Sequence, residues 1–330
     1  PISGELSTPF WIIKPNELPA PALSIPKIKT IVSEAIREIS TLTTLQLGEN
    51  LETIGGHAIR ETGAPLTITP TEFPKLTLLD SYAFYITKLS HGLSFPNLET
   101  ISSHCFHSSS VKSINAPKAK LVQESAFLSA KSLATVTLSD SITNIGNSAF
   151  YDCAKLSGFT PYLPKSVQYL GDSAFRNLTL LPSTPKFECP DLKAIGNSTF
   201  YTTAGKFDGP VDFYAPIESF GSYAFLYAQN GQVYNFHSKV APTIFLGGAF
   251  RGVNNDCMAI FNVKKRAALA GWSALCAGNE AKFEILKARD DYPGEKTIGV
   301  VYCAALANIG ESYHWAVDDT PPAGTTLLVK

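Results

Sequence analysis

Three short segments of the chain place a serine between small residues, as a nucleophilic serine would need. They are Gly146–Phe150, Gly171–Phe175 and Gly196–Phe200, and they recur at intervals of 25 residues. A nucleophile elbow requires a glycine at its fifth position, because the strand-to-helix turn is strained there. Each segment has a phenylalanine at that position instead. The regular recurrence favours a structural repeat, and we predict no catalytic residue and no enzymatic activity from these segments.

One cluster of metal-capable side chains lies in the segment His104-Cys105-Phe106-His107. We expect Cys105 to point into the core and the two histidines to flank it. No second ligand pair follows at the spacing of a zinc site, and the chain has no His-Glu-x-x-His, Cys-x-x-Cys or phosphate-loop motif. The sequence therefore predicts neither a metal nor a cofactor. A second polar cluster, with His314, Trp315, Asp318 and Asp319, lies near the carboxyl end.

These segments belong to one hexapeptide pattern that occurs ten times. The pattern is an aliphatic residue or phenylalanine, three mostly small or polar residues, a small residue, and a closing phenylalanine or isoleucine, which we call the anchor. A period of 21 to 25 residues predicts a solenoid whose units stack to bury their apolar faces. The ten anchors are Ile36, Ile59, Phe84, Phe106, Phe127, Phe150, Phe175, Phe200, Phe225 and Phe250.

Each repeat has the same order of residue types, and this order predicts how its anchor is positioned. A short β-prone run such as Thr135–Leu138 precedes a proline that ends the strand. An aliphatic pair then turns the chain inward, and Asn147, Asp172 and Asn197 are expected to cap a single helical turn that carries the anchor into the core. The eight phenylalanine anchors from Phe84 to Phe250 are predicted to form a continuous aromatic spine.

The segment from Ile145 to Leu156 reads Ile-Gly-Asn-Ser-Ala-Phe-Tyr-Asp-Cys-Ala-Lys-Leu. It resembles the second half of the BspA-type (Treponema-type) leucine-rich repeat, and the resemblance covers roughly residues 21 to 286. Ile36, Ile59 and Cys105 depart from the family pattern. The resemblance implies a right-handed solenoid of about ten repeats of 21–25 residues, with short strands, single helical turns and caps at both ends. It also implies a surface-displayed or secreted protein that adheres to host proteins or to other cells.

The ends of the chain differ from the repeats, and four segments are predicted. They are an amino-terminal cap over 1–20, the solenoid over 21–256, a strand-helix-strand cap over 257–289, and a small β tail or the start of a further module over 290–330. The cap is expected to contain strands at 259–263 and 282–286 around an amphipathic helix at 264–275. Three further strands are expected at 298–302, 312–317 and 325–329.

Composition limits the classes of partner. Charged residues make up 17% of the chain and the net charge is −1, so bulk electrostatics do not favour nucleic acid or an anionic membrane. No apolar run is long enough to cross a membrane, and the single methionine, Met258, suggests that an export signal has been removed. The six cysteines follow the repeat and are expected to be unpaired, with Cys257 and Cys276 the pair that could be an exception.

Stacking would align the residues that follow the anchors in one exposed column, for which we predict ligand binding. It would also align the residues two before the anchors in a second column, which holds His57, Tyr82, His104 and Tyr223 among serines. Tyrosine, arginine and histidine are frequent in protein interfaces. The alternative is that the tyrosine rings only shield the spine. A protein partner, or a glycan, is the expected ligand; the competing interpretations are a glycan-binding or enzymatic tail on a solenoid spacer, or a spacer alone. The proposed binding residues are Tyr85, His107, Tyr151, Arg176, Tyr201 and Arg251.

Overall fold

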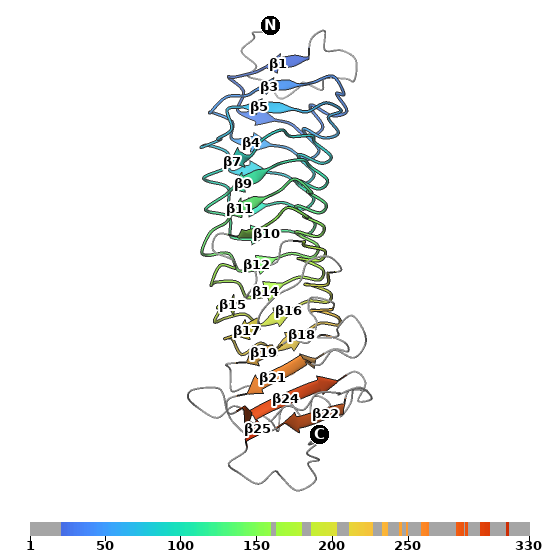
Figure 1. Ribbon diagram of the computed structural model, residues 1–330. Coiled ribbons are helices and arrows are strands. Elements are labelled where there is room, and N and C mark those ends of the chain that lie inside the picture. The colour runs from blue at the N-terminus through green and yellow to red at the C-terminus, as the bar shows by residue number, and fades with distance from the viewer. Residues whose placement is uncertain are drawn as a thin grey trace. The chain divides into compact units, whose positions relative to one another are not determined.

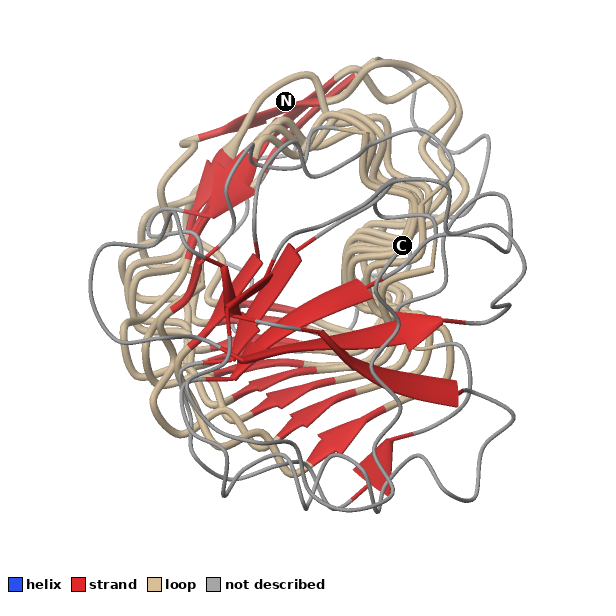
Figure 2. Cartoon of the chain, turned by 60° about the horizontal axis from the view of Figure 1, so that its bottom comes forward, coloured by secondary structure: helices blue, strands red, loops and turns tan. Residues whose placement is uncertain are grey.

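The computed structural model describes two compact units, 1–180 and 181–330. Within them it describes residues 21–159, 163–179, 186–202 and 211–226, Ala249, and the strands β19 to β25. The predicted amino-terminal cap, the helix at 264–275, the strand at 325–329 and Phe250 lie outside the described residues. Among the described residues no helix is present, and so none could cross a membrane (Figure 2).

The first unit is a solenoid in which each repeat contributes two short parallel strands (Figure 1). One series pairs β1 (Ala22–Ser24), β3 (Thr44–Gln46) and β5 (Thr67–Thr69), and then β7 (Leu93–Ser94), β9 (Ser113–Asn115), β11 (Thr135–Thr137) and β13 (Gly158–Phe159). The other pairs β2 (Thr30–Ile31), β4 (Thr53–Ile54) and β6 (Leu78–Leu79), and then β8 (Thr100–Ile101), β10 (Leu121–Val122), β12 (Asn144–Ile145) and β14 (Tyr169–Leu170). The predicted repeat solenoid is confirmed.

The second unit contains both kinds of strand. One sheet contains β16 (Ala194–Ile195), β18 (Ser219–Phe220) and β20 (Ile244–Phe245). A larger sheet has the order β15 (Lys186–Phe187), β17 (Val211–Phe213), β19 (Val233–Phe236), β21 (Ala259–Val263), β24 (Ile298–Cys303) and β22 (Lys282–Leu286). Strand β24 pairs antiparallel with both β21 and β22, so this part of the tail shares a sheet with the cap strands. Strands β23 (Ala288–Arg289) and β25 (Trp315–Ala316) form a separate pair.

The anchor segments form consecutive β-turns in place of the expected helical turn. In the repeat of Phe84, the Ala83 N–H donates to the Asp80 carbonyl and the Tyr85 N–H donates to the Tyr82 carbonyl. In the first unit, the residues two before and two after each anchor from Ile36 to Phe175 have positive φ, as Tyr82 does at 59°. A positive φ at the third residue is typical of a type II turn and prevents the helix from continuing.

The asparagines therefore do not cap a helix. The Asn147 side-chain oxygen accepts the Asp172 N–H of the next repeat at 2.9 Å, and Asn197 accepts the Ser222 N–H in the same way at 2.8 Å. The glycines that face these asparagines from the next repeat, Gly171 and Gly221, let the coils approach closely. A Cβ atom on Gly171 would lie 2.5 Å from the Asn147 backbone nitrogen, so a larger residue would push the coils apart.

Three backbone hydrogen bonds per repeat join each anchor turn to the next one. The donors are the N–H groups of the anchor and of the residues two before and two after it. In one repeat, Tyr82 donates to Ser103, Phe84 donates to Cys105 at 2.8 Å and Ile86 donates to the next repeat at 2.9 Å. These turns therefore stack in the same register as the strands do.

The phenylalanine anchors are buried and stacked. In the first unit the ring centroids of successive anchors lie 5.1–5.6 Å apart with interplanar angles of 11° or less, and in the second unit Phe200 and Phe225 are 5.0 Å apart. A second set of buried rings, which the sequence analysis did not identify, packs beside this spine. Its members are Phe73, Phe95, Phe187 and Phe213.

Replacing Phe127 by alanine should lower the free energy of unfolding by about 3–5 kcal/mol, because it opens a cavity between two stacked rings. Chemical denaturation measures the change. The matched variant Phe127→Leu keeps most of the buried volume and should lose much less stability. A loss below about 1 kcal/mol for the alanine variant would contradict a close-packed spine.

The cysteines Cys105, Cys153 and Cys189 are buried and form no disulfide bond, as expected from their places in the repeat. Burial raises the pKa of each thiol, to about 12 for Cys189. We expect iodoacetamide to leave these three cysteines unmodified in the folded protein at about pH 8, since the thiolate is the reactive form. Unfolding without reductant should expose all three to alkylation, which peptide mass spectrometry detects. Rapid labelling of the folded protein at these positions would disprove the assignment.

Ile86 combines a β-branched side chain with a φ of 53° and is 38% exposed. An L-residue in this left-handed region costs roughly 1–2 kcal/mol, and asparagine tolerates it better. Ile86→Asn should therefore raise the free energy of unfolding by about 0.5–1 kcal/mol. The control Leu78→Asn removes a comparably exposed aliphatic residue from strand β6 and should give no gain. Equal effects of the two changes would show that the backbone conformation is not the cause.

Candidate functional site

Backbone hydrogen bonds between successive repeats fix the register of the predicted column of residues that follow the anchors. The N–H of the second residue after each anchor donates to the carbonyl of the column residue one repeat further on. Glu61 donates in this way to Tyr85 at 2.8 Å, Ile86 to His107 at 2.9 Å and Ser129 to Tyr151 at 2.7 Å. The same bond fixes Arg60, Leu128 and Arg176 in the first unit.

The remaining predicted binding residues lie in the second unit. Tyr201 is half-buried, and Thr202 beside it donates its N–H to the Leu226 carbonyl, so the same register holds there. Arg251 lies outside the described residues. The structure thus places Tyr85, His107, Tyr151 and Arg176 in one column of the first unit and Tyr201 at the matching position of the second.

The column residues are half-buried, which is less exposed than the sequence analysis assumed. Their rings lie against neighbouring side chains, as expected if they shield the repeat. The phenol oxygens of Tyr82, Tyr85 and Tyr151 nevertheless form no hydrogen bond to the rest of the described chain. These hydroxyl groups remain available to solvent or to a partner.

A second column, two residues before the anchors, contains a parallel stack of three rings. The Tyr82 ring lies between those of His57 and His104, at 4.5 Å from each and tilted by 7° and 3°. All three residues have positive φ, which repeats the same side-chain direction in each coil. The stack fills both faces of Tyr82, so its ring edge and hydroxyl group are what a partner could contact.

The two columns meet in one group, which we call the ring cluster: His57, Tyr82, Tyr85, His104 and His107. Tyr85 packs edge-on against Tyr82, with centroids 5.6 Å apart at 75°. His107 packs edge-on against Tyr85 at 5.1 Å and 79°. Edge-to-face contacts of this kind stabilise aromatic pairs beyond the area they bury. The ring cluster is therefore a rigid surface of phenol and imidazole edges.

His104 and His107 are in direct contact. Their Nδ1 atoms are 3.1 Å apart, so one of the two nitrogens carries the hydrogen of an N–H···N bond. Burial lowers the pKa of His107, and the nearby His104 lowers it further. Both effects favour the neutral form of His107.

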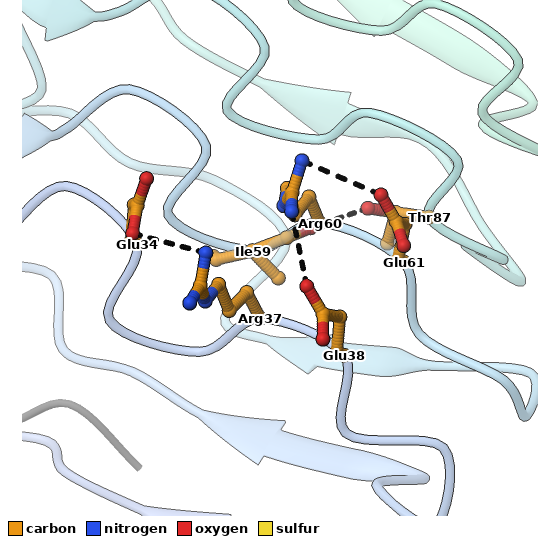
Figure 3. A network of polar contacts seen from close by, with 7 residues as sticks. All are labelled: Glu34, Arg37, Glu38, Ile59, Arg60, Glu61 and Thr87. Atoms are coloured by element: carbon orange, nitrogen blue, oxygen red, sulfur yellow. Dashed lines mark hydrogen bonds and ion pairs between the residues drawn. The ribbon is translucent and has the colours of Figure 1, made fainter. Parts of the chain in front are cut away.

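Ion pairs occupy the amino-terminal end of the first column (Figure 3). The Arg60 guanidinium contacts Glu38 of the preceding repeat at 3.0 Å and Glu61 at 3.4 Å, while Arg37 pairs with Glu34. These pairs are partly exposed, so each contributes little stability. They neutralise the charge of Arg60. The side chains of the ring cluster, by contrast, have no charged partner among the described contacts.

The column residue at the carboxyl-terminal end of the first unit is again an arginine, Arg176. The Arg176 guanidinium carbon lies 5.5 Å from the centroid of the Tyr151 ring, which is within the range of a cation–π contact. Leu128 separates this pair from His107 along the column. The predicted binding residues of the first unit therefore form two groups, Tyr85 with His107 and Tyr151 with Arg176.

The candidate catalytic and metal segments have structural roles where they are described. Ser148, Ser173 and Ser198 are the positive-φ residues of the anchor turns, with φ of 52–55°. Cys105 is fully buried between two half-buried histidines, as expected. In the part of the chain that the structure describes, no group of three or more histidine, cysteine, aspartate or glutamate side chains converges on one point. His314, Asp318 and Asp319 lie outside that part.

Sequence reasoning identified both columns but not the ring stack within them. The available signal was the recurrence of rings two residues before the anchors of three successive repeats, at His57, Tyr82 and His104. The closeness of His104 and His107 also follows from the turn between them, because the His107 N–H donates to the His104 carbonyl at 3.1 Å.

Two solved bacterial structures are similar to this chain. A leucine-rich cell surface protein from Faecalibacterium prausnitzii aligns at 16% identity with a TM-score of 0.36, covering 68% of this chain and 62% of that one. A leucine-rich repeat protein from Bacteroides ovatus aligns at 17% identity with a TM-score of 0.40, covering 68% of this chain and 70% of that one. A search of curated proteins finds no match.

The repeats themselves match a known family over most of the described solenoid. Six copies of the BspA type leucine-rich repeat region match, in segments 18–129 and 99–232. The stacked parallel strands and the buried anchors are the structure that these copies form. This chain belongs to the BspA-type leucine-rich repeat family.

Proposed function

We propose that this protein is a non-enzymatic binding protein, displayed at the cell surface or secreted, that recognises a protein partner through the columns beside its anchors. The observation that carries the proposal is the register of these columns. Backbone hydrogen bonds hold Tyr85, His107 and Tyr151 at equivalent positions in their repeats, and the tyrosine hydroxyl groups have no partner in the described chain.

The chemistry of the column suits a protein partner. Tyrosine, histidine and arginine combine a large ring or planar group with polar edges, which is the composition of interface hot spots. Because the rings are already packed against each other, little side-chain entropy is lost when a partner binds. A rigid surface of this kind favours recognition by shape over recognition by bulk charge, in keeping with the net charge of −1.

The location at the surface or outside the cell is supported by family membership and by the Faecalibacterium protein, whose own description is a cell surface protein. The buried repeat cysteines are compatible with this location, because they fill apolar positions and do not depend on reducing conditions to stay unpaired. Host proteins or proteins of neighbouring cells are the proposed partners, with glycans as the second class.

Substitution of Tyr85 and Tyr151 by serine in the full chain tests the proposal. Loss of two interface tyrosines should weaken binding to a responsive member of an array of extracellular host proteins by about 30-fold or more. The control Tyr169→Ser changes a tyrosine that is 41% exposed in strand β14, away from both columns, and should leave affinity unchanged. Circular dichroism verifies that all variants are folded.

A parallel measurement separates the column from the tail. Substitutions of His314 and Asp318 by alanine should leave binding intact if the column is the site. Loss of binding on these changes, with normal binding by the double serine variant, would place the function in the tail and make the solenoid a spacer. A hit confined to a glycan array would assign the ligand to the second class.

A further inference from the structure

We propose that His104 and His107 form a two-imidazole site for a divalent transition-metal ion, with water completing the coordination. This site lies within the ring cluster but does not depend on the proposed protein partner. The evidence is the closeness of two imidazole nitrogens, together with the packing that holds both rings in place.

The distance between the two nitrogens is the first argument. The Nδ1 atoms of His104 and His107 are 3.1 Å apart. Two metal–nitrogen bonds of about 2.0–2.1 Å place their nitrogens about 2.9 Å apart at a right angle and about 3.4 Å apart at a tetrahedral angle. The observed separation lies between these two values, so one ion can bridge both nitrogens in either geometry. Imidazole nitrogen is a suitable ligand for Cu²⁺, Ni²⁺ and Zn²⁺.

The packing of the two rings is the second argument. The His104 ring is stacked on Tyr82 at 4.5 Å, and the His107 ring packs against Tyr85 at 5.1 Å. The turn itself fixes the spacing of the two residues through the backbone bond from His107 to His104. Both ligands are therefore largely preorganised, which reduces the entropy lost on binding an ion. Because both residues are half-buried, water can reach the open coordination positions.

The N–H···N bond between the rings is the metal-free state, and a bound ion replaces its hydrogen as the group that joins the two nitrogens. When an ion binds, the hydrogen on one Nδ1 atom moves through solvent to Nε2 of the same ring, so the neutral pair gains and loses no proton. Both Nδ1 lone pairs are then free to coordinate the ion. The described chain supplies these two nitrogens and no third metal-capable side chain at this point, so water must provide the remaining ligands.

Calorimetric titration with Cu²⁺, Ni²⁺ and Zn²⁺ at about pH 7.5, where unperturbed imidazole is mostly neutral, tests the site. Affinity should fall in the order Cu²⁺, Ni²⁺, Zn²⁺. His104→Gln and His107→Gln should each weaken Ni²⁺ binding by about tenfold or more, and the double variant should bind one equivalent less. The control His91→Gln removes a histidine outside the ring cluster, whose Nε2 accepts the Ile68 N–H, so it should bind metal as the original protein does.

Electron paramagnetic resonance of the Cu²⁺ complex gives a second measurement that needs no variant. Hyperfine structure from two imidazole nitrogens, at one equivalent of Cu²⁺, is the expected result. A spectrum without two nitrogen ligands, or equal metal binding by the original protein and the double variant, would overturn the proposal and locate any binding elsewhere in the chain.

Discussion

The hydrogen bonds between successive anchor turns are the interaction on which the rest of each unit depends. They require N–H groups at alternate positions, two before the anchor, at the anchor and two after it, to point toward the next repeat. Two of these three residues adopt positive φ, which costs roughly 1–2 kcal/mol for each non-glycine residue. The bonds they form and the burial of the anchor ring offset this cost, because an unpaired N–H in the same place would be penalised further.

Much of the fold follows from the sequence because the pattern repeats. The period, the strand of Thr135–Thr137, and the cap strands β21 and β22 all lie where alternation and proline predict them. The second series of strands was missed, since strands of two residues such as β8 carry no alternation that can be recognised. The helical turn was also expected wrongly. Asn147 is a good capping residue in isolation, but here its side chain bonds to the adjacent repeat, which local sequence cannot reveal.

The alignment of the candidate site residues in columns could be predicted from the sequence, whereas the contacts between their side chains could not. Counting from the anchor places Tyr85, His107 and Tyr151 at equivalent positions, and the backbone bonds show why this counting works. The ring stack depends on rotamers and on the distance between coils, neither of which a periodic pattern contains. The same limit explains why Tyr85 and Tyr151 were expected to be exposed, whereas contacts with neighbouring side chains leave them half-buried.

The architecture separates the residues that hold the fold from the residues that meet solvent. At the position two before the anchor, Tyr82 and Ser148 have nearly the same φ, 59° and 52°, although one carries a phenol ring and the other a hydroxymethyl group. The backbone conformation there is set by the hydrogen bonds between coils, so the side chain can change without altering the turn. Rings can therefore occupy this position in three successive repeats while serines occupy it in the next four, with the same backbone conformation. This independence is what allows a repeat surface to acquire a binding site, or a pair of metal-capable imidazoles, without rebuilding its core.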